Sequence, residues 1–425
     1  MWNVDLRLRH FFPGFLVPLP SYPSVAEGFL LLCICIFTLT SPSVYQTQST
    51  LIRLALAPPA VWLFWNFGFE TSYNPPGAQV AVGMAVVGLY GVMRIIDTSI
   101  VTLIDRVIPF WVHTPTGKVL PTPTSMKDRL AFTIDYATSL RGTSCFSDRH
   151  WNWVPTPLIR SATRNLSRTE FLMRSLRSIV LQYFLLDVLD SINKSRKWDT
   201  ANRFPITSLS IPEQILFSIS VCVGTTLPII IMHEIVASVA VALGSSPASW
   251  PPMFDRPFHS TSLADFWGRR WHAIFRRVFV RLSTLVLMFL PIPSGYTRLR
   301  IAARAIAIFA LSASLHILLM YRLELSNPSH PSLLQTFLDR SILTFFLVQP
   351  VGLAVEALAV RPLVVKMSAS EKVQRNVMRM WAWGFMLWSG RYWSDVWVKR
   401  GMWGETEHVV GYSLVRGLLK GQWKT

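Results

Sequence analysis

The chain has 425 residues, of which 51% are hydrophobic and only 15% are Asp, Glu, Lys or Arg. A soluble chain carries about 25% charged residues, so the composition argues against a soluble globular protein. The net charge of +18 raises the question of nucleic-acid binding, but the Lys and Arg lie in loops and at the ends of apolar stretches. The positive-inside rule predicts that placement for a membrane protein, and we expect no nucleic-acid partner.

Apolar stretches recur along the chain after a short amphipathic lead-in over residues 1–23. A transmembrane helix needs on the order of 20 apolar residues. The stretches lie at about 24–40, 51–68, 77–93, 171–190, 213–255, 304–322, 341–360 and 377–390. We count about eight spans and predict an all-α fold, a polytopic transmembrane helix bundle with cytosolic amphipathic helices. No small-residue cleavage site accompanies the first stretch, so we expect a retained helix and not a signal peptide.

Two arginine-rich regions separate the apolar stretches. Residues 112–170 are polar, basic and proline-containing, which predicts a long extramembrane loop, and residues 255–281 form the second region. Both are expected on the cytosolic side. The predicted organisation has N-terminal transmembrane helices over 1–110, a basic extramembrane loop over 111–170 and a helical core over 171–425.

The segment 262–272, with the sequence SLADFWGRRWH, combines charged and aromatic residues. If it is a helix, Asp265, Arg269 and His272 lie on one face, since they are spaced i, i+4 and i+7. The side chains on adjoining faces are Phe266, Trp267, Arg270 and Trp271. Such aromatics and arginines bind headgroups or stack on an adenine ring. The alternative is an interfacial amphipathic helix that only anchors the protein.

His316 lies inside an apolar stretch that is bracketed by Arg304 and Arg322. An ionisable residue within a membrane helix is a candidate for function. The alternative is a neutral histidine that hydrogen-bonds to a neighbouring helix. The small residues at 312–314 permit close helix packing and are consistent with both interpretations.

Two further polar pairs interrupt apolar stretches. His233 and Glu234 form either a proton-handling pair or, as we favour, the polar join between two short helices. Gln349 and Glu356 are seven residues apart and share one helix face. They either line a polar cavity or make hydrogen bonds within the bundle, which is the more common case.

A basic, aromatic loop provides the last candidates. It contains Arg141 in the motif Leu140–Thr143, followed by the aromatic run His150–Trp153. The loop either helps to close a cytosolic face over an anionic ligand or rests on lipid headgroups.

Several motifs are missing from the sequence. It has no G-x-x-x-x-G-K-[ST] phosphate loop, no G-x-S-x-G elbow and no H-E-x-x-H helix, because position 237 is Ala. The four cysteines have no zinc-type spacing. An ATP-driven machine, a serine hydrolase of that type and a metal site are therefore not expected.

The string 262–272 resembles the signature of the wax synthase-like branch of the membrane-bound O-acyltransferases. His316, after the sequence LSASL, resembles the second signature of this branch, and it lies 44 residues after His272. The elements at 140–143 and 151–153 resemble an upstream family motif, here split by residues 144–150. The resemblance extends over roughly 130–400. A histidine at position 272, where other members have asparagine, is similar to the fungal members, which acetylate terpenoid and related secondary metabolites.

The resemblance implies an acyl-CoA-dependent O-acyltransferase in the endoplasmic reticulum membrane. It is expected to transfer acetyl from acetyl-CoA to a hydroxyl of a lipophilic alcohol, with no permanently bound cofactor and with membrane lipids around it. His316 would be the general base, and His272 would hold the thioester or stabilise the oxyanion. The residues expected to bind the cosubstrate are Asp265, Trp267, Arg269, Arg270, Trp271 and Arg141. The alternatives are a long-chain wax or sterol ester synthase and a transporter, although we find none of the internal repeats that transporters often have.

Overall fold

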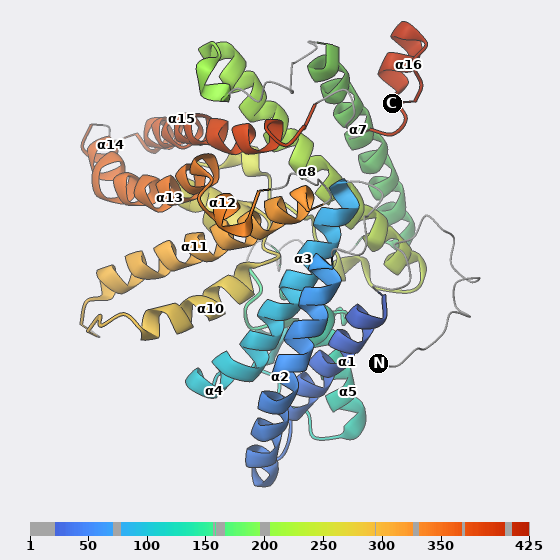
Figure 1. Ribbon diagram of the computed structural model, residues 1–425. Helices are drawn as coiled ribbons and strands as arrows, with labels where there is room; N and C mark the ends of the chain where they lie inside the picture. Colours follow the sequence, from blue (N-terminus) through green and yellow to red (C-terminus); the bar gives the residue numbers. More distant parts are fainter. Residues whose placement is uncertain are drawn as a thin grey trace. The chain divides into compact units, whose positions relative to one another are not determined.

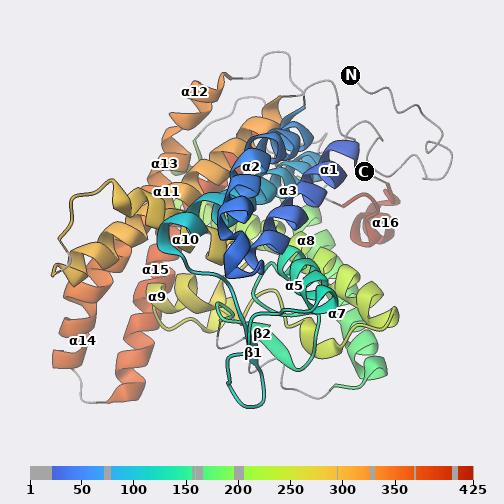
Figure 2. The same cartoon turned by 90° about the horizontal axis from the view of Figure 1, so that it is seen from below.

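A computed structural model gives the fold (Figure 1). The residues that it describes are 22–70, 78–155, 158, 166–195, 205–293, 295–325, 331–367, 370–403 and 410–424. They are mostly helical, as expected for an all-α chain. Two short strands, β1 (Trp111–His113) and β2 (Arg149–Trp151), form a two-stranded sheet, and Figure 2 shows them side by side.

The helices are labelled in chain order in Figure 1. They are α1 (Tyr22–Leu39), α2 (Gln46–Phe69), α3 (Ala78–Ile96), α4 (Thr102–Asp105), α5 (Met126–Thr138), α7 (Arg168–Ser195), α8 (Ile211–Ala242), α9 (Leu263–Asp265), α10 (Arg276–Met288), α11 (Thr297–Glu324), α12 (Leu333–Phe337), α13 (Arg340–Val355), α14 (Arg361–Met367), α15 (Glu371–Val398) and α16 (Leu414–Lys420). Wider π-helical turns continue some of them, at Asp97–Val101, Phe266–Arg270 and Glu356–Val360.

Four helical segments in the described residues are long and apolar enough to cross a membrane. They are Val80–Asp105, Ile211–Ala242, Thr297–Glu324 and Leu333–Met367. Each exceeds the roughly 20 residues that span a hydrocarbon core of about 30 Å at 1.5 Å per residue. These segments are those of a membrane protein, while the count of about eight spans stays a prediction.

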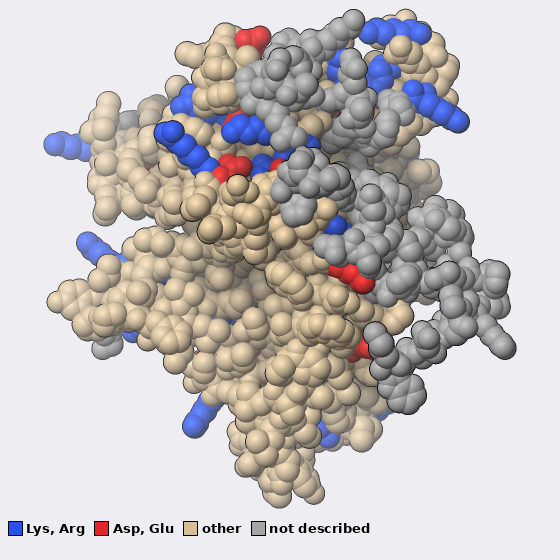
Figure 3. All heavy atoms as spheres, in the orientation of Figure 1, with Lys and Arg blue, Asp and Glu red and all other residues tan. Residues whose placement is uncertain are grey.

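Large apolar side chains are also exposed on the surface. On α7, Leu176, Val180 and Leu181 are each more than half exposed. Figure 3 shows wide areas on one face of the molecule without a charged side chain. A soluble protein rarely exposes contiguous apolar surface on this scale, so these faces fit contact with lipid.

The chain forms two compact units. Unit 1 comprises Met1–Val112, Val119–Leu140 and Phe275–Leu338, and unit 2 comprises His113–Lys118, Arg141–Ile274 and Asp339–Thr425. The predicted organisation into segments 1–110, 111–170 and 171–425 stays a prediction.

In unit 1, α1, α2 and α3 pack against one another, and α3 also contacts α11. Helices α2 and α3 approach closely at Gly91, where a Cβ atom would lie 2.2 Å from the ring of Phe64. Leaving out that Cβ lets the ring pack directly on the helix backbone, which explains why a glycine is needed here.

A buried charge cluster joins the helices of unit 1. Asp97, at the end of α3, accepts hydrogen bonds from Arg277 of α10 at 3.0 Å and from Arg281 at 2.7 Å. It also accepts from the hydroxyl of Tyr136 on α5, and Arg94 lies 3.9 Å away. We did not single out this cluster from the sequence, although Asp97 follows an apolar stretch as an isolated acid.

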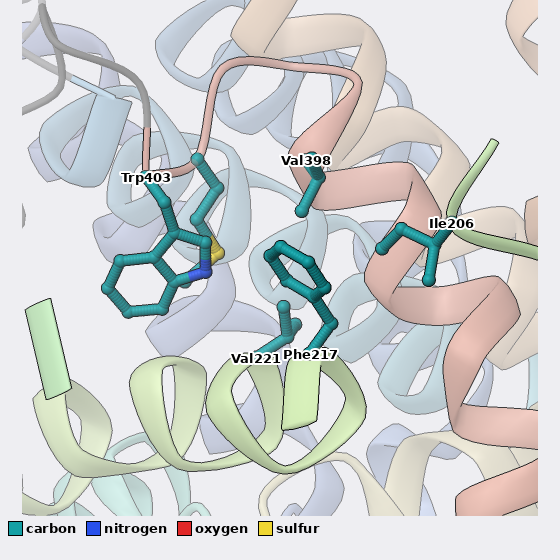
Figure 4. Packing of buried hydrophobic residues seen from close by; sticks show 6 residues of the cluster. Ile206, Phe217, Val221, Val398 and Trp403 are labelled. Atoms are coloured by element: carbon teal, nitrogen blue, oxygen red, sulfur yellow. The ribbon is translucent and has the colours of Figure 1, made fainter. Parts of the chain in front are cut away.

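Unit 2 is built around α7, α8, α13 and α15. Phe217 and Val221 of α8 pack against Val398 at the end of α15, together with Ile206 and Trp403 (Figure 4). This apolar cluster fixes α8 against α15. Residues 141–153 and the segment 262–272 also belong to unit 2.

One local prediction is wrong. His233 and Glu234 do not join two short helices, since α8 runs unbroken through them. The region 112–170, predicted as an extramembrane loop, contains α5, whose Ser125 cap accepts a hydrogen bond from the amide of Asp128. The charged residues in the first turn of α5 make this stretch look like a polar loop in the sequence. In the structure, Phe132 and Tyr136 give the helix a buried face.

Candidate functional site

The segment 262–272 is not one helix. The short α9 passes into the π-helical turn Phe266–Arg270, which is closed by a hydrogen bond from Trp271 N to Phe266 O. Trp271 is extended, and helical structure resumes only in α10. His272 therefore lies beyond the helix, and the prediction that it shares a helix face with Asp265 and Arg269 is wrong. The wider turn and the extended Trp271 break the spacing on which that prediction depended.

Asp265 organises the charges of this turn. One carboxylate oxygen accepts hydrogen bonds from Arg270 Nε at 2.7 Å and from Thr261 N at 3.2 Å. Arg269 lies 3.5 Å from the other oxygen, and its side chain is 70% exposed. Arg270 is thus tied into the turn, whereas Arg269 presents an accessible guanidinium group.

Aromatic rings surround the same turn. Phe266 stacks on Trp271 with ring centroids 5.0 Å apart, and Phe254 meets both Trp271 and His272 edge to face. Trp267 contacts Phe266 and Trp271. His272 therefore follows a rigid aromatic group that restricts where its imidazole can point.

The helix α13 holds the turn from another side. Glu356 accepts hydrogen bonds from the backbone amides of Leu263 and Ala264, and Gln349 accepts one from the indole of Trp267. Of the two roles left open for this pair, hydrogen bonding within the bundle is therefore the one observed.

Arg141 is buried, and three acceptors surround its guanidinium group. It donates to the carbonyl of Pro252 at 2.7 Å, to that of Pro251 at 2.6 Å and to Nε2 of His233 at 3.0 Å. Burial lowers the pKa of Arg141 to about 10, so the group stays positive at neutral pH. Arg141 thus ties the chain just before the segment 262–272 to α8.

The loop motif split by residues 144–150 is reunited in space. Thr143 pairs with His150, and Trp151 N donates to Gly142 O at 2.9 Å, so the intervening residues form a hairpin. Gly142 has φ +84°, and a Cβ there would lie 2.8 Å from the backbone of Val154. The position therefore requires glycine.

His316 lies in α11, half-buried, in unit 1. Its Nδ1 is 2.7 Å from the carbonyl oxygen of Ser312. A carbonyl only accepts, so Nδ1 carries the proton, and Nε2 holds the lone pair of the neutral ring. His272, in contrast, belongs to unit 2.

The residues that support the site left little trace in the sequence. Pro251 and Pro252 contribute backbone carbonyls, which every residue has, so the residue type does not predict this role. Ser389, which accepts from Gln349, lies in a tryptophan-rich helix where nothing in the sequence marks it. Among the described residues, no three His, Cys, Asp or Glu side chains gather so that they could hold a metal ion.

Residues 250–347 match the model of the membrane bound O-acyl transferase family. Acetyltransferase sirH of Emericella nidulans is 27% identical over 34% of this chain and 34% of its own length. Acetyltransferase ataH of Aspergillus terreus is 29% identical over 52% of this chain and 75% of its own length. A long-chain-alcohol O-fatty-acyltransferase of Simmondsia chinensis is 29% identical over 36% of this chain and 40% of its own length.

The family match contains both His272 and His316. The resemblance predicted from the sequence is confirmed over the matched residues. The alignments with these three relatives span from about a third to three quarters of their lengths.

Proposed function

We propose that this chain is a membrane-bound O-acyltransferase, which transfers an acetyl group from acetyl-CoA to a hydroxyl of a lipophilic secondary metabolite. The acceptor would be a terpenoid or meroterpenoid that enters from the bilayer, in the endoplasmic reticulum. The family match over 250–347 carries this proposal, because it contains both histidines and because two fungal relatives are named acetyltransferases.

The proposed reaction needs no covalent intermediate on the enzyme. His316 Nε2 takes the proton of the acceptor hydroxyl while its oxygen attacks the thioester carbonyl. The tetrahedral intermediate then collapses to the ester and coenzyme A thiolate, which takes up the proton. The hydrogen bond from Nδ1 to Ser312 O supports this role, since it keeps the lone pair on Nε2 and orients the ring. General-base catalysis of this kind contributes about 10²–10⁴-fold.

His272 is proposed to stabilise the negative charge that develops on the thioester oxygen. A hydrogen-bond donor held at that oxygen stabilises the transition state most where water is excluded from the site. The contacts of His272 with Phe254 and Trp271 support this role, because they limit the orientations of the imidazole.

The exposed Arg269 is proposed to bind a phosphate of coenzyme A. Guanidinium groups pair with phosphate oxygens in bidentate geometry. Asp265 and Arg270 would keep the turn in shape for this contact, with Trp267 and Trp271 beside it. Arg141, which is buried and engaged with backbone carbonyls, would act by holding the preceding chain.

A long-chain acyl donor is the second candidate. It is favoured by the similarity to the O-fatty-acyltransferase of Simmondsia chinensis. The two proposals share the same histidine chemistry and differ in the length of the acyl chain that the protein admits.

The test is product mass analysis. Membranes that contain the protein receive terpenoid alcohols or a C16 alcohol, each with acetyl-CoA or palmitoyl-CoA, and membranes with His316→Ala serve as the control. We expect acetate esters of terpenoid alcohols from the wild type only. Palmitate esters alone would favour the second candidate, and the absence of any ester dependent on His316 would overturn both.

A further inference from the structure

We infer that Glu356 and Gln349 of the α13 region are positioning residues, which hold the segment 262–272 in the orientation needed for acyl transfer. This inference rests on the proposed function and assigns it two residues that do not themselves contact the reactants.

The start of the segment 262–272 has backbone amides, those of Leu263 and Ala264, whose acceptor lies outside the segment. Helix α9 has three residues, and isolated helices this short are unstable because nucleation is costly. The first amides of a helix also lack partners within it. An external acceptor is therefore needed at this helix start.

Glu356 provides that acceptor. Its two carboxylate oxygens accept from Leu263 N at 2.6 Å and from Ala264 N at 3.2 Å, and the residue is only 2% exposed. Hydrogen bonds to a charged acceptor are about twice as strong as neutral ones. Glu356 also begins the π-helical turn Glu356–Val360, a type of distortion found frequently at functional sites.

Gln349 makes the second attachment, two helical turns before Glu356. Its Oε1 accepts from the indole N–H of Trp267 at 3.1 Å. Its Nε2 donates to Phe345 O and to the hydroxyl of Ser389 on α15. The donors of the amide are thus turned toward α13 and α15, which leaves the oxygen for Trp267. The segment is thus held at two points, the amides of 263–264 and the indole of Trp267. With two such points, it cannot rotate about a single one.

The attached segment carries the groups that the proposed reaction uses. Arg269, Trp271 and His272 follow directly, and α10 begins only at Arg276. Because a displacement of about 1 Å in a reacting group costs up to 10²-fold in rate, a loosened attachment would lower activity without removing any reacting group.

A general contribution to stability is the competing explanation, and Asp395 gives a matched control. Asp395 is also 2% exposed in unit 2, and it accepts from a backbone amide, Ile206 N at 2.8 Å, and from the Ser341 hydroxyl at 2.6 Å. It supports the loop before α8 and the first turn of α13, and it pairs with Lys399. Among the described residues, none of its hydrogen bonds or ion pairs is with the segment 262–272.

The experiment compares Glu356→Gln, Gln349→Met and Asp395→Asn with the wild type, each as the purified full chain in detergent. Hydrogen exchange is followed in the peptide that covers 261–275, alongside kcat and KM. For Glu356→Gln and Gln349→Met we expect at least tenfold faster exchange in this peptide. We also expect kcat to fall about 10–100-fold and KM for acetyl-CoA to rise, with KM for the alcohol unchanged. Asp395→Asn should lower Tm but keep exchange in 261–275, kcat and both KM values within about twofold of the wild type.

Unchanged exchange at 261–275 in both α13 variants would overturn the inference, whatever the activity. Kinetic changes in Asp395→Asn as large as those in Glu356→Gln would overturn it as well, since they would reflect stability alone. If the wild type forms no ester, the proposed function fails, while the exchange measurement still decides whether α13 holds the segment.

Discussion

Nη2 of Arg141 donates a hydrogen bond to Nε2 of His233 over 3.0 Å. An arginine has no acceptor, so His233 must present a lone pair at Nε2 and carry its proton on Nδ1. The same guanidinium group donates to the carbonyls of Pro251 and Pro252. A loop residue, a helix residue and the chain before the segment 262–272 are thereby connected through a single side chain.

Replacement of this side chain is expected to destabilise unit 2. Arg141→Lys keeps the charge, but one ammonium group cannot reach three acceptors that lie around a planar fork. We expect the free energy of unfolding to fall by about 1–3 kcal/mol, the usual cost of leaving a buried group unsatisfied. Thermal unfolding of the purified protein in detergent measures it. Arg149→Lys is the control, since Arg149 pairs with the exposed Asp148, and equal shifts for both variants would contradict this account.

His316→Ala is expected to reduce acyl transfer by about 10²–10⁴-fold, because it removes the proposed base. Expression and membrane insertion should be unchanged. Ser312→Ala is the matched control and should keep its activity. His316 Nδ1 bonds to the backbone carbonyl of Ser312, which this substitution keeps. Steady-state rates of ester formation give the answer. Wild-type turnover in His316→Ala, or an equal loss in Ser312→Ala, would rule out the assignment.

Arg269→Gln is expected to raise KM for acetyl-CoA about tenfold, since a hydrogen bond to a charged group is worth about 1.5–3 kcal/mol. Stability should hardly change, because the side chain is 70% exposed. Kinetics at two salt concentrations test the cause, since added salt should weaken the proposed contact between Arg269 and phosphate in the wild type and affect the variant less. A variant with the same KM and the same salt dependence as the wild type would remove Arg269 from the binding site.

Asp97→Asn is expected to destabilise unit 1 by about 3–5 kcal/mol, because it leaves buried arginines without their counter-charge. Asp105→Asn should cost less, since Asp105 pairs with Arg281 alone among the described residues and is partly exposed. Chemical unfolding monitored by tryptophan fluorescence compares the two. A smaller loss for Asp97→Asn than for Asp105→Asn would contradict the central role of Asp97 in the cluster.

The amino-acid sequence determined that the chain has membrane helices and identified the stretch that resembles the O-acyltransferase family. Long apolar runs predict membrane helices wherever they occur, because the thickness of a bilayer sets the length of such a run. The string 262–272 and His316 were likewise identified from local patterns, and the family match contains both. Polar α5 was missed, since its buried face is only apparent once its neighbours are present.

The tertiary structure alone decided how the segment 262–272 is shaped and held. Read locally, its spacing predicts a regular helix, but the observed π-helical turn and extended Trp271 place His272 outside it. The groups that bind this segment, Glu356 and Gln349, are more than 80 residues away along the chain. The local sequence pattern predicts which faces of a helix are apolar. It does not predict the hydrogen-bond partner of a buried polar group, because that partner comes from a distant helix that only folding brings close.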